Sequence, residues 1–131
     1  MTTAVIGTQA QAGVIATAKT QSDIDLIAGK MKNYYPLDLT LDETRPTYQF
    51  DVSWAGSIPV AFQAFLEGNS FEDVVRNAIS VGGDSDTIAS MAGAIASVYY
   101  KDIPDDLVVK TLTYLPDDLR TIFTKWQSFV G

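Results

Sequence analysis

The chain has 131 residues, a net charge of −7 and a hydrophobic content of 47%, which is typical of one soluble domain with its own core. Its nine basic residues are dispersed, so the surrounding field repels nucleic-acid phosphates and anionic lipids, and neither is expected as a partner. The absence of cysteine and histidine excludes disulfides, thiolate nucleophiles, imidazole bases and the commonest zinc ligands. Any chemistry is left to carboxylates and hydroxyls.

The beginning of the sequence lacks the basic start and the apolar core of a signal peptide. No stretch approaches the roughly eighteen apolar residues that a membrane helix needs. We therefore expect a cytoplasmic protein without membrane contact. Because no linker, repeat or low-complexity segment divides the chain, we expect a single domain over residues 1–131.

Helical spacing and capping signals recur along the chain, so the sequence predicts an all-α fold, a compact bundle of roughly seven helices. The first predicted helix covers about residues 4–19 and lacks a convincing cap. The second has Ser22 as its cap and ends near Tyr35. A capping box at residues 40–43 predicts one or two turns, and residues 45–56 are predicted to form an extended loop.

The later helices are marked by clearer boundaries. Ser57 is the predicted cap of the next helix, which has a proline in its first turn. A helix over residues 70–81 then leads to a glycine pair, and a long apolar helix follows to Tyr100. Two short helices are predicted to begin at Pro104 and Pro116, each with two acids in the first turn, where the helix dipole favours them.

The most polar cluster of the sequence, Gly-Gly-Asp-Ser-Asp-Thr at residues 82–87, lies directly before the apolar helix. Helix capping explains one or two of its oxygens, because one carboxylate can accept an amide and another can interact with the dipole. Four consecutive oxygen-bearing side chains exceed that need, and the two glycines permit positive φ. The small and aliphatic residues that follow indicate a helix packed on most sides, so its polar end is held in place.

Two carboxylates held close together are costly unless one is protonated or a cation lies between them. Carboxylate and hydroxyl oxygens suit a hard cation such as Mg²⁺. The cluster offers about three ligands, which is half of an octahedral or binuclear site. The remaining ligands must come from elsewhere in the chain, from solvent, from a bound ligand or from another polypeptide.

The run from Gly82 to Ala96 resembles the C-terminal metal-binding motif of the ADP-ribosylglycohydrolase family, the DraG-like hydrolases. Residues 45–53, 56–61 and 76–80 resemble the segments that precede this motif, and the resemblance extends from about Gly7 to the C-terminus. Members of this family are all-α proteins that use two Mg²⁺ ions to hydrolyse the glycosidic bond between ADP-ribose and a modified side chain or another leaving group.

The resemblance assigns roles to particular residues. It implies that the metal ligands are Asp84, Asp86 and Thr87. It implies that the turn at the ligand site is shaped by Gly82, Gly83 and Ser85. It also implies an ADP-ribose pocket near Ser53 and Trp54. The aromatic rings of Tyr48, Phe50 and Trp54 either stack on adenine or belong to the core.

Two family features are absent from this sequence: the early glycine-rich Gly-Asp segment and the Thr-Asp-Asp motif that supplies the other metal ligands. The chain therefore resembles only the C-terminal half of the family fold, and no catalytic residue is assigned. Three hypotheses follow. The chain is a hydrolase when a separate N-terminal half completes its magnesium site, or an inactive binder of ADP-ribose or an ADP-ribosylated molecule, or a protein-interaction module. Because a missing half would expose apolar helix faces, we expect a homo-oligomer or a complementing partner chain.

Overall fold

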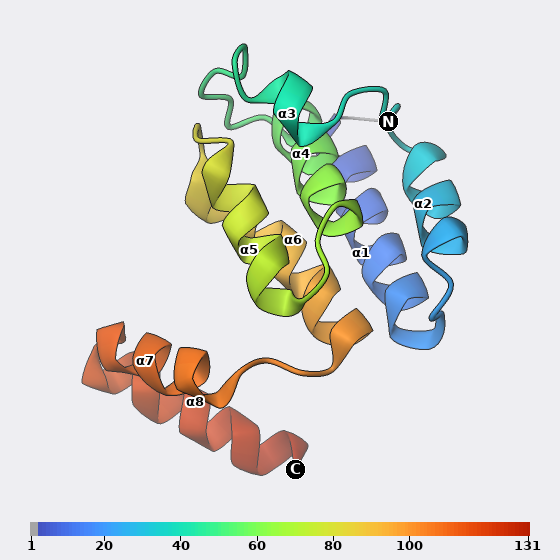
Figure 1. Cartoon of the computed structure of the whole chain (residues 1–131). Coiled ribbons are helices and arrows are strands. Elements are labelled where there is room, and N and C mark those ends of the chain that lie inside the picture. Colours follow the sequence, from blue (N-terminus) through green and yellow to red (C-terminus); the bar gives the residue numbers. More distant parts are fainter. Residues whose placement is uncertain (1–2) are drawn as a thin grey trace.

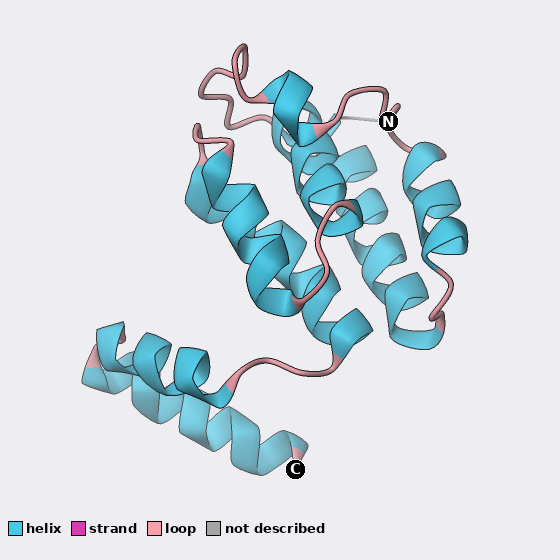
Figure 2. Ribbon diagram, viewed as in Figure 1, coloured by secondary structure: helices cyan, strands magenta, loops and turns pink. Residues whose placement is uncertain are grey.

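A computed structural model describes residues 3–131, and every regular element in this range is an α-helix (Figures 1 and 2). The helices are α1 (Thr3–Thr20), α2 (Ile24–Lys32), α3 (Leu41–Thr44), α4 (Trp54–Leu66), α5 (Phe71–Ser80), α6 (Ser85–Tyr100), α7 (Asp105–Tyr114) and α8 (Asp117–Val130). The all-α prediction is confirmed. Residues 1 and 2 of the predicted domain lie outside the described range, within which no helix is long and apolar enough to cross a membrane.

Helix α6 is the centre of the bundle and packs against α1, α4 and α5. Its buried residues are mostly small: Ile88, Ala92, Gly93, Ile95 and Ala96. Small side chains let neighbouring helices approach closely, and a Cβ on Gly93 would lie only 3.6 Å from the side chain of Val75 on α5. The prediction that this helix is packed on most sides is confirmed.

Larger side chains from the neighbouring helices complete the core around α6. Phe62 and Phe65 of α4 are fully buried, as are Ile27 and Met31 of α2. The ring of Phe65 meets that of Tyr99 edge to face, with centroids 5.3 Å apart, which is a favourable aromatic geometry. The bundle therefore holds α4 and α6 in fixed relative positions.

Two predicted helix starts are wrong. Asp23, not Ser22, caps α2, and its carboxylate accepts a hydrogen bond from the Asp25 amide at 2.9 Å. Ser53, not Ser57, caps α4, and its Oγ accepts from the Gly56 amide at 3.0 Å. Ser57 instead lies buried inside α4. The proline at position 59 misled the prediction, because it lies in the second turn of α4 rather than in the first.

One end of the bundle gathers the starts of α4 and α6, the short helix α3 and the loops at residues 45–53 and 81–84 (Figure 1). The sequence places these segments far apart, whereas the antiparallel path of α5 returns the chain to the same end. The hairpin of α7 and α8 lies at the opposite end, below α5 and α6 in the view of Figure 1. Neither helix of this hairpin contains a buried residue.

Candidate functional site at the start of helix α6

The turn before α6 depends on two consecutive glycines in the left-handed region. Gly82 has φ +82° and Gly83 has φ +64°, a conformation that costs other residues about 1–2 kcal/mol. The expectation that these glycines shape the turn agrees with this geometry. The turn delivers Asp84 as the N-cap residue of α6.

Asp84 is an N-cap residue whose side chain makes no capping hydrogen bond. The other capping-type residues of the described chain, Asp23, Thr40, Ser53 and Ser70, all accept an amide of their own helix, with ψ between 109° and 168°. Asp84 has φ −79° and ψ 61°, close to an inverse γ-turn, and this backbone turns the carboxylate away from the helix amides. The half-buried Asp84 is therefore not explained as a helix cap.

The second carboxylate of the cluster lies within hydrogen-bonding reach of the first. A hydrogen bond with Asp84, aided by the Thr87 amide, which donates to Asp86 Oδ1 at 3.0 Å, holds the pKa of Asp86 below its usual range. Asp86 is exposed, while Ser85 and Thr87 are half-buried. The structure thus brings together the predicted ligands Asp84, Asp86 and Thr87 at one helix end.

Tyr48 connects this turn to the start of α4, a link that the sequence did not reveal. Its ring covers Gly83, where an added Cβ would lie 2.5 Å from Tyr48 Cε1. Its hydroxyl donates a hydrogen bond to the Gly56 carbonyl at 3.1 Å. Burial raises the pKa of Tyr48, and the negative charges of Asp51 and Asp84 act in the same direction, against a hydrogen bond with Ser57.

Asp51 organises the loop that faces the turn. Its Oδ1 accepts from the Ser53 amide at 2.8 Å, and its backbone carbonyl accepts from the buried Ser57 hydroxyl at 2.9 Å. Hydrogen bonds with the Ser53 side chain and backbone hold the pKa of Asp51 below its usual range. A Cβ on Gly56 would collide with the Asp51 carboxylate, so residue 56 needs to be glycine.

The two predicted pocket residues lie in different environments. Ser53 is exposed, and its hydroxyl already accepts the capping hydrogen bond of α4. The half-buried ring of Trp54 lies against Gly7 of α1, where an added Cβ would come within 2.7 Å of it. This contact gives Trp54 a packing role between α1 and α4. Phe50 is 69% exposed and leaves its ring faces available to a ligand.

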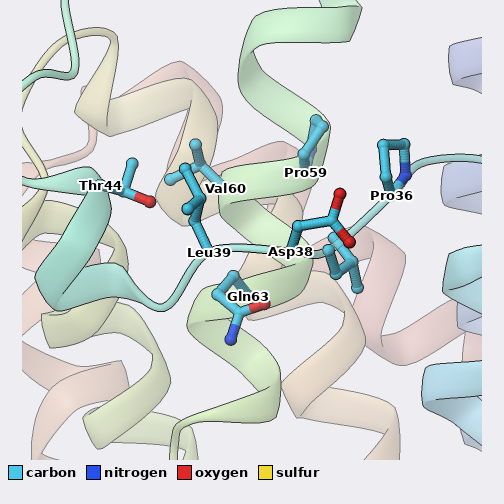
Figure 3. A pocket seen from close by; sticks show the side chains of 8 residues that line it. Pro36, Asp38, Leu39, Thr44, Pro59, Val60 and Gln63 are labelled. Carbon is cyan, nitrogen blue, oxygen red and sulfur yellow. The ribbon is translucent and has the colours of Figure 1, made fainter.

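Two open depressions lie beside this end of the bundle. One of about 530 Å³ is lined by Leu39, Thr44, Thr47, Tyr48, Gln49, Phe50 and Asp51. The other, of about 310 Å³, lies between the loop before α3 and helix α4, where Leu39, Thr44, Pro59 and Gln63 surround it (Figure 3). The larger depression contains Tyr48, whose ring lies against Gly83 of the turn, and Asp51, whose negative charge helps to raise the pKa of Tyr48. Its volume falls in the usual range of small-molecule sites.

The donor set fits only part of a hard-cation site. Asp84 and Asp86 supply carboxylates, and Thr87 supplies a hydroxyl, which are the oxygen ligands that Mg²⁺ prefers. Within residues 3–131, however, no group of three or more acidic, histidine or cysteine side chains is placed to hold a metal ion. The described part of the chain therefore provides no complete metal site of this kind.

The all-helical fold is consistent with that of a helical hydrolase family. The ADP-ribosylglycohydrolase family model matches residues 2–128, and the chain belongs to this family. Human ADP-ribosylhydrolase ARH3 is 54% identical over 55 residues, covering 34% of this chain and 15% of the human protein. The bovine ARH3 protein is 44% identical over a segment of the same length and coverage.

An uncharacterised protein of Archaeoglobus fulgidus is 38% identical over 48 residues, covering 37% of this chain and 16% of the archaeal protein. The chain thus aligns with about one sixth of the length of these curated relatives. We find no solved structure that matches it.

Proposed function

We propose that the chain binds Mg²⁺ and an ADP-ribose-type ligand at the start of α6, and that it contributes to hydrolysis of an ADP-ribosyl N- or O-glycosidic bond when other residues complete the site. The observation that carries this proposal is that the Asp84 carboxylate, at the N-cap of α6, makes no capping hydrogen bond. An acid at an N-cap normally satisfies a helix amide, and this one does not. Family membership and the name of the human relative support ADP-ribose as the ligand class.

Each residue of the site has a distinct role in this proposal. Asp84, Asp86 and Thr87 hold the cation, and Gly82, Gly83 and Ser85 set the turn that presents them. A bound Mg²⁺ supplies positive charge that stabilises the departing group. Tyr48 keeps the turn against α4, and the exposed Phe50 ring stacks on the adenine in the larger depression.

Completion requires ligands from outside the described residues. We propose that a polypeptide carrying the family's Thr-Asp-Asp motif supplies these ligands, together with the group that activates water. Without such a polypeptide, the chain binds ADP-ribose and does not turn it over. The small number of acids at the turn supports the proposal that a second polypeptide supplies the remaining metal ligands.

The second candidate function is that of a binding protein for an ADP-ribose-derived nucleotide that takes part in no hydrolysis. The incomplete donor set favours it, because two carboxylates and a hydroxyl suffice to hold a cation with water and ligand phosphate as further ligands. This candidate predicts the same binding and differs only in its response to a complementing polypeptide.

Isothermal titration of the purified chain with ADP-ribose, in Mg²⁺ and then in EDTA, tests the proposal. We expect binding in Mg²⁺ and at least a tenfold weaker affinity in EDTA. The variant Asp84→Asn/Asp86→Asn should lose the magnesium-dependent binding while retaining the helical circular-dichroism spectrum. The matched control is Asp105→Asn/Asp106→Asn, which removes two first-turn acids from α7, at the other end of the molecule.

Equal affinity in Mg²⁺ and EDTA would remove the metal from the proposal. Unchanged binding by the Asp84→Asn/Asp86→Asn variant would show that these acids are not ligands. Release of free ADP-ribose from an ADP-ribosylated peptide after addition of an N-terminal family fragment would favour the hydrolase over the binding protein.

A further inference from the structure

Helix α8 carries an exposed apolar stripe that no part of the described chain covers. The stripe consists of Leu119 (47% exposed), Ile122 (62%), Trp126 (59%) and Phe129 (82%), and we call these four residues the α8 stripe. Their spacing of three, four and three residues places them on one face of the helix. Phe123, the α8 residue that turns toward α7, is the only half-buried residue of this helix.

A helix with these properties needs a partner. Isolated helices shorter than about 12–15 residues are marginal in water, and in proteins most helical stability comes from packing an apolar face. The helix α8 has 14 residues, none of them buried, and a polar opposite face that includes Asp117, Thr121, Thr124 and Ser128. The contact with α7 covers only one flank, so the α8 stripe is left to an external surface.

We propose that the α8 stripe is the interface with a second copy of this chain, formed by antiparallel packing of the two α8 helices. In one register, Ile122 faces the second copy's Trp126, and Leu119 faces the second copy's Phe129. The same two pairs recur on the other side of the dyad, which crosses the interface at the axial level of residue 124. Each layer then joins an aliphatic side chain to an aromatic one, as the knobs of an antiparallel coiled coil do.

The area available agrees with a weak, reversible dimer. A buried aromatic side chain contributes about 150–250 Å², so two partly exposed aromatics and two aliphatics offer on the order of 500 Å² per copy. A standard specific interface buries about 800 Å² per partner, and weak transient ones bury less. The pair therefore lies at the small end of specific interfaces and should dissociate on dilution.

The interface leaves the candidate functional site accessible. Helix α8 lies at the opposite end of the bundle from the turn at residues 82–84 (Figure 1). Asp118 and Lys125 both lie beside the stripe on the edge nearest Phe129. In the proposed register the two Lys125 residues are near the dyad, about 3 Å apart along the helix axis, and Asp118 of one copy is about 18 Å from its equivalent.

Sedimentation equilibrium of the full chain, from micromolar to millimolar concentration, tests whether the dimer exists. We expect a reversible monomer–dimer equilibrium that is weakened at least tenfold by Trp126→Gln/Phe129→Gln. Thr121→Gln/Ser128→Gln, on the polar face of the same helix, should leave the equilibrium unchanged. A monomer at every concentration, or equal weakening by both double variants, would overturn the proposal.

Crosslinking determines the orientation of the two helices. The natural chain has no cysteine, so a single introduced cysteine reports on one position. A short bis-maleimide should join Lys125→Cys chains into dimers and leave Asp118→Cys chains monomeric, because only position 125 approaches its equivalent. Equal crosslinking at both positions would indicate parallel packing and overturn the antiparallel arrangement.

Discussion

Gly82 and Gly83 both have positive φ, but their surroundings differ. Nothing lies within 4 Å of a Cβ placed on Gly82, whereas a Cβ on Gly83 would collide with the ring of Tyr48. We expect Gly82→Ala to cost about 1–2 kcal/mol of unfolding free energy, from backbone strain alone. Gly83→Ala should cost about 1–3 kcal/mol more, because the ring must move.

Urea denaturation of the two glycine variants measures this difference. Equal losses of stability would show that Tyr48 does not restrain the turn. A second readout is ADP-ribose affinity, which we expect Gly83→Ala to weaken more than Gly82→Ala, since a displaced Tyr48 releases the link between the turn and α4.

The lowered pKa of Asp51 has a consequence for the pH dependence of stability. Its hydrogen bonds with Ser53 favour the charged form in the folded state, so their stabilisation is present above the unfolded pKa of about 3.9. It is lost as pH falls through the lower folded-state pKa. We expect Asp51→Asn to reduce the acid-induced drop in melting temperature below pH 4.

Thermal melts between neutral pH and pH 2.5 measure this effect. The control is Asp118→Asn, which changes the net charge equally at an exposed site on α8. If both variants altered the acid-induced drop to the same extent, the effect would come from net charge and not from the loop hydrogen bonds.

At the scale of the helices, two serines near the start of α4 have different roles, although either could be a helix cap by sequence. Ser53 caps the helix, and Ser57 lies inside it. Ser53→Ala removes the N-cap and should cost about 1 kcal/mol, and Ser53→Asn should restore most of it. Ser57 is 1% exposed and donates to the Asp51 carbonyl. Ser57→Asn should cost more than Ser53→Ala, because it forces a larger polar side chain into a packed interior.

Melting temperatures of the three serine variants, followed by circular dichroism, give the comparison. If Ser57→Asn were tolerated and Ser53→Asn were not, the helix would begin at the later serine, as the sequence suggested.

The sequence predicted most helices correctly because their signals are local. The capping box of Thr40 and Glu43 is present, and the paired acids after Pro104 and Pro116 lie in first turns as expected. Helix ends were less predictable: α2 ends at Lys32, not near Tyr35. A signal for ending a helix depends on tertiary contacts as much as on the next proline.

The candidate site was only partly predictable from sequence. The acids at residues 84 and 86 were predicted as site residues because four consecutive oxygen-bearing side chains at one helix start are more than a helix cap needs. The role of Tyr48 did not follow, because its contacts with Gly83 and Gly56 join segments that are distant in the chain. The two consecutive glycines were the available sequence signal, because a glycine can mark a position where another part of the chain approaches the backbone closely.

At the scale of the whole molecule, the stability of the chain resides in the bundle of α1 to α6. Phe62 is fully buried, so Phe62→Ala should cost about 3–5 kcal/mol. Phe129 is 82% exposed, and Phe129→Ala should change the unfolding free energy by less than about 0.5 kcal/mol in dilute solution. Denaturant titration at low micromolar concentration, where the proposed dimer should be dissociated, tests both values. A large loss for Phe129→Ala would mean that the hairpin belongs to the core.

Residues 101–104 connect the buried bundle to the exposed hairpin, and we expect the two parts to open independently. Lys101 ends α6 in the left-handed conformation, and beyond it no residue of α7 or α8 is buried. Amide protons in the hairpin can therefore exchange with solvent through local opening, whereas those in the middle of α6 must wait for the bundle to unfold. We therefore expect the molecule to open as two cooperative units, so that an unpaired hairpin can unfold completely while the turn that presents Asp84 keeps its shape.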